Sequence, residues 1–250
     1  MKPNPKPSRR KKSTTAGLRR FWIAFAFVLA LAGVGAYLAA TWPALYPRRI
    51  VVAGNRVVPS DQILAAAAID RRRNLWLQNS HAIAARVEAI PFVYRVWVHR
   101  RLPADATIVV TERVPYAVVR VAGATLLVDR ALRVLAVDGP GNALPTIVSK
   151  LATVPDAGGY LRDASVRELA DDLQALESAN VDVREVALDR YGGLVATRPD
   201  GTDILLGDDD NLAQKIVLIA PIESQTASGR KVRTIDLREA GTPVVVYGTP

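Results

Sequence analysis

The chain contains no cysteine and only two histidines among its 250 residues. The lack of cysteine excludes a disulfide framework, a cysteine-ligated metal and a thiol nucleophile. His81 and His99 lie far apart in the sequence, without the short spacing of a metal-ligand pair. No glycine-rich phosphate-binding loop is present either. These absences favour a protein that holds partners over an enzyme, and we expect no catalytic residue, no cofactor and no metal.

Two short motifs suggest chemistry but lack the residues that would complete it. Residues 228–231 match S-x-x-K, without the S-D-N and K-T-G motifs that accompany it in penicillin-recognising enzymes. Three consecutive aspartates at 208–210 lack the glycine and terminal glutamate of a calcium loop. They precede a helix expected from about Asn211, where the helix dipole favours negative charge. A membrane-anchored enzyme stays an alternative, and it would need perturbed ionisable groups clustered in a deep pocket.

Acidic residues are missing from the first twenty positions, which hold eight of the 33 lysines and arginines. The net charge of the whole chain is +9, so the remainder is close to neutral. A basic run beside an apolar stretch is a topology signal, because cations next to a membrane span stay in the cytoplasm. The alternative is a nucleic-acid-binding arm. The neutrality of the rest favours the first interpretation, and we expect no nucleic acid as partner.

Charge of either sign is missing from residues 21–41. At about 1.5 Å per residue such a helix crosses a hydrocarbon layer of about 30 Å. Trp22 and Trp42 lie near its ends, where aromatic side chains favour the membrane interface, and Pro43 stops the helix. The alternative is a cleavable signal peptide, whose apolar core is shorter, about 7–15 residues. We expect an uncleaved anchor in the lipid bilayer, with the N-terminus cytoplasmic and residues 44–250 outside.

After the prolines, the residue pattern predicts a small first domain. It indicates a strand at 49–52, a helix starting at Ser60, a second helix ended by Pro91, and two strands around a turn at 102–105. Strict alternation would place Tyr94, Val96 and Val98 on one face of the strand that precedes the turn at 102–105. Two helices on one face of a small sheet can bury a core of this size.

The rest of the chain favours a second domain built mainly from strands. A helix is expected at 166–179, and Gly201 marks a hairpin turn. The expected strands are 183–188, 194–197, 203–206 and 244–247. The last of these is short and apolar, and two interpretations stay open for it: an unpaired edge strand that a partner can extend, or an internal core strand.

A series of residues then follows one family's pattern. The spacing V-x4-V-x-R-x2-P-x4-I-x-V-x-E-R-x-P-x-A is formed by Val93, Val98, Arg100, Pro103, Ile108, Val110, Glu112, Arg113, Pro115 and Ala117. It resembles the close of the POTRA domain of the FtsQ/DivIB cell-division proteins. The segments 126–129, 144–145 and 236–238 resemble the family's Val-Asp, Leu-Pro and Asp-Leu-Arg motifs. Ala131 or Leu132 replaces a glycine of the family pattern.

The resemblance implies an α+β fold: a single N-terminal transmembrane helix, a small POTRA domain of order β-α-α-β-β, and a larger, mostly antiparallel β domain with flanking helices. The expected division is a basic cytoplasmic tail at 1–20, a transmembrane helix at 21–42, a POTRA domain at 46–114, a β domain at 115–247 and a short tail at 248–250.

It also implies a non-enzymatic scaffold of the bacterial divisome in the cell membrane, concentrated at the septum. Its expected partners are FtsB and FtsL homologues and other divisome proteins, with no small-molecule substrate. The resemblance assigns partner binding to Arg238, Glu239, Gly241 and Tyr247, and the candidate edge strand adds Val244 and Val246 as expected partner-binding residues. Glu239 stands where some relatives have an aromatic residue. The first strand and second helix of the POTRA part are expected to help recruitment.

A second class of membrane protein stays open as an alternative. POTRA domains also occur in outer-membrane assembly and secretion proteins, which usually carry several POTRA repeats and a long barrel of alternating strands. This chain has one POTRA-like unit behind a helical anchor, which favours the divisome interpretation.

Overall fold

The computed structural model describes residues 15–121, 123–139, 141, 143–150, 154–208, 210–226 and 231–248. The expected basic tail therefore lies mostly outside the described residues, as do the last two residues of the expected C-terminal tail and most of the S-x-x-K motif. The elements are α1 (Thr15–Thr41), η1 (Pro43–Leu45), β1 (Arg49–Ala53), α2 (Ser60–Ala67), η2 (Leu75–Leu77), α3 (Ser80–Glu88), β2 (Val93–Arg101), β3 (Asp105–Glu112), β4 (Ala117–Val121), β5 (Ala124–Val128), β6 (Val134–Val137), β7 (Thr146–Val148), α4 (Ala164–Ser178), β8 (Glu185–Leu188), β9 (Leu194–Thr197), β10 (Asp203–Gly207), α5 (Leu212–Thr226), β11 (Val232–Asp236) and β12 (Val244–Tyr247).

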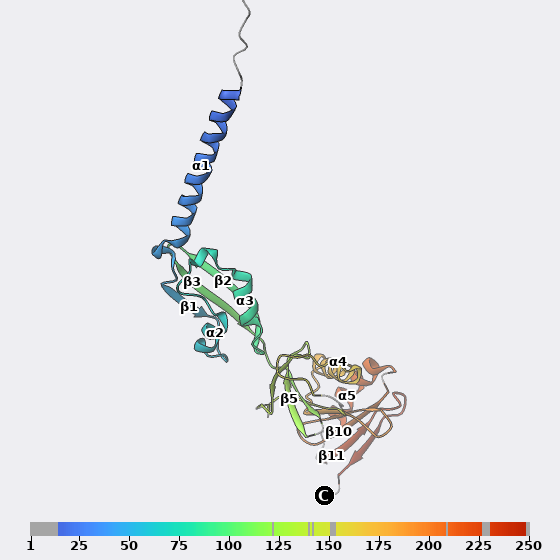
Figure 1. Cartoon of the computed structure of the whole chain (residues 1–250). Helices are drawn as coiled ribbons and strands as arrows, with labels where there is room; N and C mark the ends of the chain where they lie inside the picture. The colour runs from blue at the N-terminus through green and yellow to red at the C-terminus, as the bar shows by residue number, and fades with distance from the viewer. Residues whose placement is uncertain are drawn as a thin grey trace, which may run out of the picture.

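The apolar segment forms one long helix, α1, that stands clear of the folded domains (Figure 1). Its stretch Leu18–Thr41 is long and apolar enough to cross a membrane, and none of it is buried against the protein. The helix ends at Thr41, and Pro43 begins the short turn η1, as the sequence predicts.

The first domain is a three-stranded sheet of order β1-β3-β2. β1 pairs in parallel with β3, and β2 pairs with β3 in the antiparallel sense. Helices α2 and α3 supply Ile63, Ala67, Ile83 and Val87 to a core that they share with the sheet. The expected order of elements is therefore confirmed.

Tyr94 does not share the buried face of β2, and this part of the sequence prediction is wrong. The register with β3 shifts between Val93 and Arg95. One extra residue in a strand reverses the alternation of side chains beyond it. Val93 and Val96 are consequently both buried, whereas Tyr94 is 53 % exposed. Its ring instead lies 5.1 Å from the guanidinium carbon of Arg113, at the end of the domain.

Glu112, at the end of β3, fastens the loop between β1 and α2. Its carboxylate accepts hydrogen bonds from the backbone N–H groups of Arg56 (3.0 Å), Val57 (2.9 Å) and Val58 (2.8 Å). Burial tends to raise the pKa of this carboxyl, but the three backbone donors outweigh burial and lower it. The glutamate of the E-R-x-P pattern therefore acts as a loop clip within the first domain.

The second domain contains one nine-stranded sheet of order β12-β11-β10-β9-β8-β7-β4-β5-β6. Its antiparallel pairs are β12–β11, β10–β9, β9–β8, β4–β5 and β5–β6. The pairs β11–β10, β8–β7 and β7–β4 are parallel. The domain is therefore mostly antiparallel, as expected.

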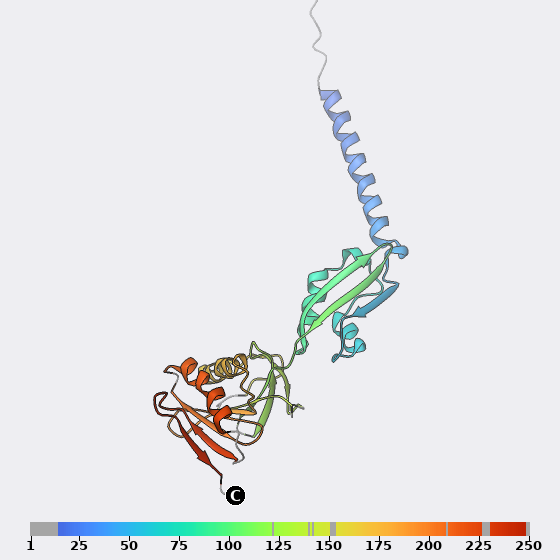
Figure 2. The same cartoon turned by 180° about the vertical axis from the view of Figure 1, so that it is seen from behind.

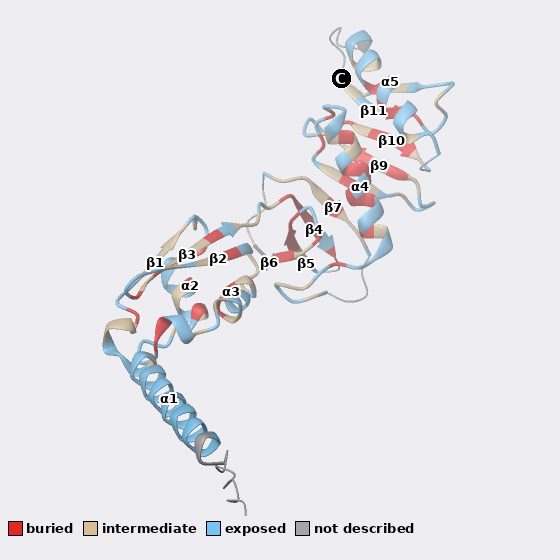
Figure 3. Ribbon diagram, turned by 90° about the horizontal axis from the view of Figure 1, so that it is seen from above, coloured by how far each residue is buried: buried red, intermediate tan, exposed pale blue. Residues whose placement is uncertain are grey.

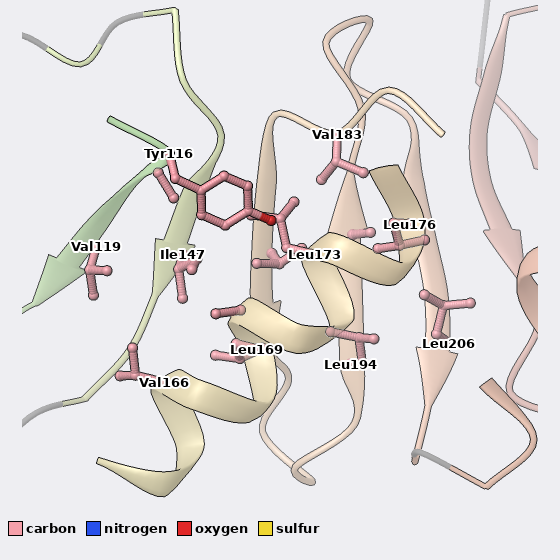
Figure 4. Packing of buried hydrophobic residues seen from close by; sticks show 14 of the residues in the cluster. Tyr116, Val119, Ile147, Val166, Leu169, Leu173, Leu176, Val183, Leu194 and Leu206 are labelled. Atoms are coloured by element: carbon pink, nitrogen blue, oxygen red, sulfur yellow. The ribbon is translucent and has the colours of Figure 1, made fainter. Parts of the chain in front are cut away.

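Helix α4 covers the middle of this sheet and provides much of its core (Figures 3 and 4). Asp163 caps the helix by accepting hydrogen bonds from the N–H groups of Ser165 and Val166. Leu169, Leu173 and Leu176 recur on the inward face and are at most 1 % exposed. Burying one such leucine contributes about 1.5–3 kcal/mol, so this stripe is a main source of the domain's stability.

A buried ion pair joins the two domains. Arg113, just after β3, meets Asp129, just after β5, at 2.6 Å, and both side chains are at most 10 % exposed. The Arg113 Nε also donates to the carbonyl oxygen of Val93 in the first domain. Asp129 accepts from the N–H groups of Ala131 and Arg133 in the second domain. Each partner is thus bonded to its own domain, and the pair links the two domains. Figure 2 shows the two domains from behind, following one another along the chain.

The loop clip gives a first prediction. Glu112→Gln replaces one acceptor oxygen by an NH₂ group that faces backbone donors, and we expect a loss of about 1–2 kcal/mol in unfolding free energy at neutral pH. The native carboxyl has a lowered pKa, so its contribution is full above its unfolded pKa and fades as pH falls through the folded one. Urea unfolding, followed by Trp76 and Trp97 fluorescence, should show the difference shrinking below about pH 4. A pH-independent difference would contradict this account.

The domain junction gives a second prediction. Asp129→Asn keeps an acceptor for the Ala131 and Arg133 amides but leaves Arg113 buried without a counter-charge. We expect it to cost about 3–5 kcal/mol. The matched control is Glu185→Gln, which breaks the exposed pair with Arg120 and should cost less than about 1 kcal/mol. Equal shifts of the two urea midpoints would refute the buried-pair interpretation.

Candidate partner-binding edge

The last strand, β12, lies at the edge of the nine-stranded sheet. It pairs with β11 through Asp236↔Val244, Ile235↔Val245 and Thr234↔Val246. A turn precedes it, in which the N–H of Thr242 donates to the carbonyl of Glu239 at 3.1 Å. The edge interpretation of residues 244–247 is confirmed, and the internal-strand alternative is wrong.

The side chains of β12 divide between two faces of the sheet. Val245 lies opposite Ile235, which is 1 % exposed and belongs to the core. Val244 and Val246 lie on the other face and are 53 % and 46 % exposed. At Val244–Val246, this edge therefore combines an outer side of backbone that pairs with no further strand of the described residues and the exposed apolar side chains of Val244 and Val246, the two features that an added strand requires.

The opposite edge of the same sheet is covered by the chain itself where β6 begins. The segment between β7 and α4 runs beside it, with the N–H of Gly158 donating to the carbonyl of Val134 and the N–H of Val134 donating to that of Gly159. The N–H of Leu161 bonds the carbonyl of Leu132 in the same way. Within the described residues, β12 is thus the edge of this sheet that no neighbouring segment covers.

Arg238, the first predicted site residue, is held in place by Asp236 at the end of β11. Its guanidinium donates from Nε (3.0 Å) and Nη2 (2.5 Å) to the carboxylate, and its backbone N–H donates as well. The side-chain bond from Arg238 is the main reason that the pKa of Asp236 is lowered. The Arg238 side chain is still 54 % exposed, so this positioned cation faces solvent.

Gly207 gives Arg238 its place beside β10. Its φ of +73° is a left-handed conformation, and a Cβ there would lie 3.1 Å from Cγ of Arg238. Lys215 of α5, only 3 % exposed, closes the same strand end by donating to the carbonyls of Leu206 (2.8 Å) and Asp208 (3.0 Å). Asp236 and Gly207 are not among the site residues predicted from the sequence; the short Asp-x-Arg spacing was the available signal.

The structure brings all six predicted site residues together on the β11–β12 hairpin. Arg238, Glu239 and Gly241 occupy the connection, and Val244, Val246 and Tyr247 lie on β12. All six are exposed, Tyr247 at 37 %. β1, the first strand of the small domain, also lies at the edge of its own sheet.

A separate cavity of about 520 Å³ opens at the domain junction. It is lined partly by Glu112, Arg113, Tyr116 and Asp129, the groups that form the loop clip and the ion pair. Burial, with the nearby charge of Glu177, raises the pKa of Tyr116 to about 12. In the described part of the chain, no three acidic or histidine side chains are grouped to hold a metal ion.

Two family models match successive parts of the chain. The model described as "POTRA domain, FtsQ-type" matches residues 46–113. The model described as "Cell division protein FtsQ/DivIB, C-terminal" matches residues 117–238. The chain belongs to the FtsQ/DivIB family. The second match includes Arg238 and ends before Glu239, so β12 lies beyond it.

Individual proteins that are similar to this chain are named cell division protein FtsQ. The chain is 28 % identical to cell division protein FtsQ of Mycolicibacterium smegmatis over 90 % of its own length, and to that of Mycobacterium tuberculosis over 87 %. Each match spans 66 % of the relative. A solved extracytoplasmic domain of DivIB from Geobacillus stearothermophilus superposes with a TM-score of 0.31 and 15 % identity, over 48 % of this chain and 99 % of that one.

Proposed function

We propose that this protein is a non-enzymatic, membrane-anchored scaffold of the divisome that binds FtsB- and FtsL-type partners at β12 and links them to septal wall synthesis. The uncovered edge of β12 carries the proposal. A partner strand laid along it would bond the outer backbone of Val244–Val246 and cover the side chains of Val244 and Val246. Family membership supports the cell-division role.

The connection before β12 would give the added strand its specificity. Arg238 is fixed by Asp236 and offers a partner carboxylate a cation whose orientation is already set. Glu239 and Gly241 border the entry to the strand. Tyr247, at its far end, supplies an aromatic anchor of the kind that contributes most to interfaces.

The same proposal places the large domains outside the cytoplasm and the protein at the septum. The basic residues before α1 far outnumber Arg48 and Arg49 after it, and this bias keeps the N-terminal side in the cytoplasm. α1 would then anchor the chain in the cell membrane as a single-pass protein.

Substitutions that introduce a positive charge into β12 test whether the partner binds there. Val246→Lys and Tyr247→Lys place an ammonium group where the proposal buries an apolar side chain, and we expect FtsB-type partner affinity to fall at least tenfold. The matched control is Val217→Lys on α5, which is 71 % exposed and lies outside the hairpin. Affinity is measured by titrating the partner complex onto the full chain in nanodiscs. Unchanged affinity in both β12 variants, with folding intact, would exclude this edge.

Orientation is tested by labelling, since the chain has no native cysteine. Val217→Cys should react in intact spheroplasts with a membrane-impermeant maleimide, because it lies on the proposed outer side. Ser13→Cys should react only after the membrane is permeabilised. The reverse pattern would overturn the proposed topology.

A further inference from the structure

The end of the POTRA domain nearest α1 carries exposed apolar and cationic side chains side by side. The apolar ones belong to the end of α1, to η2 and to the turn between β2 and β3: Trp42, Trp76, Leu77 and Leu102. The cationic ones are Arg48, Arg49, Arg71, Arg72, Arg73 and Arg101. We call these ten residues the anchor-proximal surface.

Hydrogen bonds tie this surface to α1. The side-chain Nδ2 of Asn74, which is 6 % exposed, donates to the carbonyl of Ala39 in α1 at 3.3 Å. The N–H of Arg48 donates to the carbonyl of Ala104 at 3.0 Å. Figure 1 shows α1 arriving at this end of the first domain. η2 and the β2–β3 turn therefore lie at the level where α1 ends.

That level is the headgroup layer of a bilayer crossed by α1. Ala39 lies two residues inside the end of the apolar stretch Leu18–Thr41, or about 3 Å along the helix axis. Headgroups extend about 5–7 Å beyond the hydrocarbon on each side. A side chain bonded to the Ala39 carbonyl is therefore within reach of lipid headgroups, together with η2 that follows it.

Hydrogen bonds fix the segments that carry the apolar side chains of the anchor-proximal surface. Trp76 Nε1 donates to the carbonyl of Pro103 at 3.0 Å, which joins η2 to the turn. Arg100 donates to the carbonyls of Leu75, Trp76 and Gln78 and lies over the Trp76 ring at 5.6 Å. Leu77 and Leu102 nevertheless remain 62 % and 72 % exposed. Leu77 and Leu102 are therefore exposed even though hydrogen bonds fix the region that contains them.

Charge complements these apolar side chains. Residues 42–49, 70–79 and 99–105 contain seven arginines and two aspartates. In the described part of the chain, none of the six exposed arginines of this surface forms an ion pair with a carboxylate. Arginines beside aromatic and leucine side chains are the composition that binds an anionic lipid interface.

We propose that the anchor-proximal surface docks on anionic phospholipid headgroups of the leaflet in which α1 ends. Leu77, Leu102 and Trp42 enter the interface, while Arg71–Arg73 and Arg101 bond the lipid phosphates. This contact fixes the POTRA domain against the membrane and sets the direction in which the β domain projects. The inference rests on the proposed anchoring by α1.

The test uses the full chain in vesicles of phosphatidylcholine, with or without about 30 % phosphatidylglycerol. Single-cysteine variants carry an environment-sensitive fluorophore, and lipids with a nitroxide at headgroup depth quench it. Leu77→Cys reports docking, Ala24→Cys reports insertion of α1, and Tyr191→Cys, 77 % exposed in the β domain, reports background. We expect label 77 to be quenched several-fold more than label 191, and more strongly with phosphatidylglycerol.

Arginine removal identifies the headgroup contact. R71Q/R72Q/R73Q should lower the ratio of docked to free domain, read from label 77, by about fivefold per arginine. R162Q/R184Q/R190Q makes the same charge change in the β domain and should leave the ratio unchanged. Higher salt should also lower the ratio of docked to free domain, because it screens the attraction between the arginines and the lipid phosphates.

Three outcomes overturn the inference, and they differ from one another. If label 24 is quenched while label 77 matches label 191 in both lipids, docking is wrong and anchoring stands. If label 24 is not quenched, both fail. If the two triple variants behave alike, the arginines do not recognise phosphate and the proposed anionic specificity is wrong.

Discussion

The Arg113–Asp129 pair is the contact on which the arrangement of the molecule depends. It is buried, it joins residues that directly follow one strand of each sheet, and each partner is bonded to backbone of its own domain. Removing either charge would leave the other largely buried without a counter-charge, which disfavours any arrangement that separates the two. Arg133 adds a second link by donating to the carbonyl of Glu88 in α3. Because the connection between the domains is short and these bonds cross it, the orientation of one domain constrains the orientation of the other.

This junction links the two ends of the protein. At one end, Asn74 and Arg48 tie the POTRA domain to the region where α1 ends. At the other, β12 lies at the last position of the nine-stranded sheet (Figure 1). If both connections are stiff, the edge of β12 is presented at a defined distance from the membrane. The proposed scaffold role would gain from this, because a partner anchored in the same membrane would meet β12 with less orientational freedom to lose.

The sequence predicted those features that depend on local pattern. An uncharged apolar run indicated α1, and the strand β12 was placed at the same four residues that the structure assigns. Tyr94 was misplaced because a bulge breaks the alternation on which such a prediction rests. The roles of Glu112 and Asp129 could not be derived either, since their partners are distant in sequence or belong to another domain. Family resemblance marked these residues as a pattern, and the structure supplies the physical reason.

The unequal treatment of the two sheet edges is the strongest argument from the fold toward a binding role. Open edges are a liability, because their unpaired backbone groups can pair with any available strand. Within the described residues, the chain covers the start of the β6 edge, at Val134, with the segment that contains Gly158 and Gly159, yet no strand pairs with the outer side of Val244–Val246. A fold that needed only stability would gain by covering both edges. An apolar edge strand of only four residues limits unspecific pairing, and under the proposed function it would keep one site available for the partner.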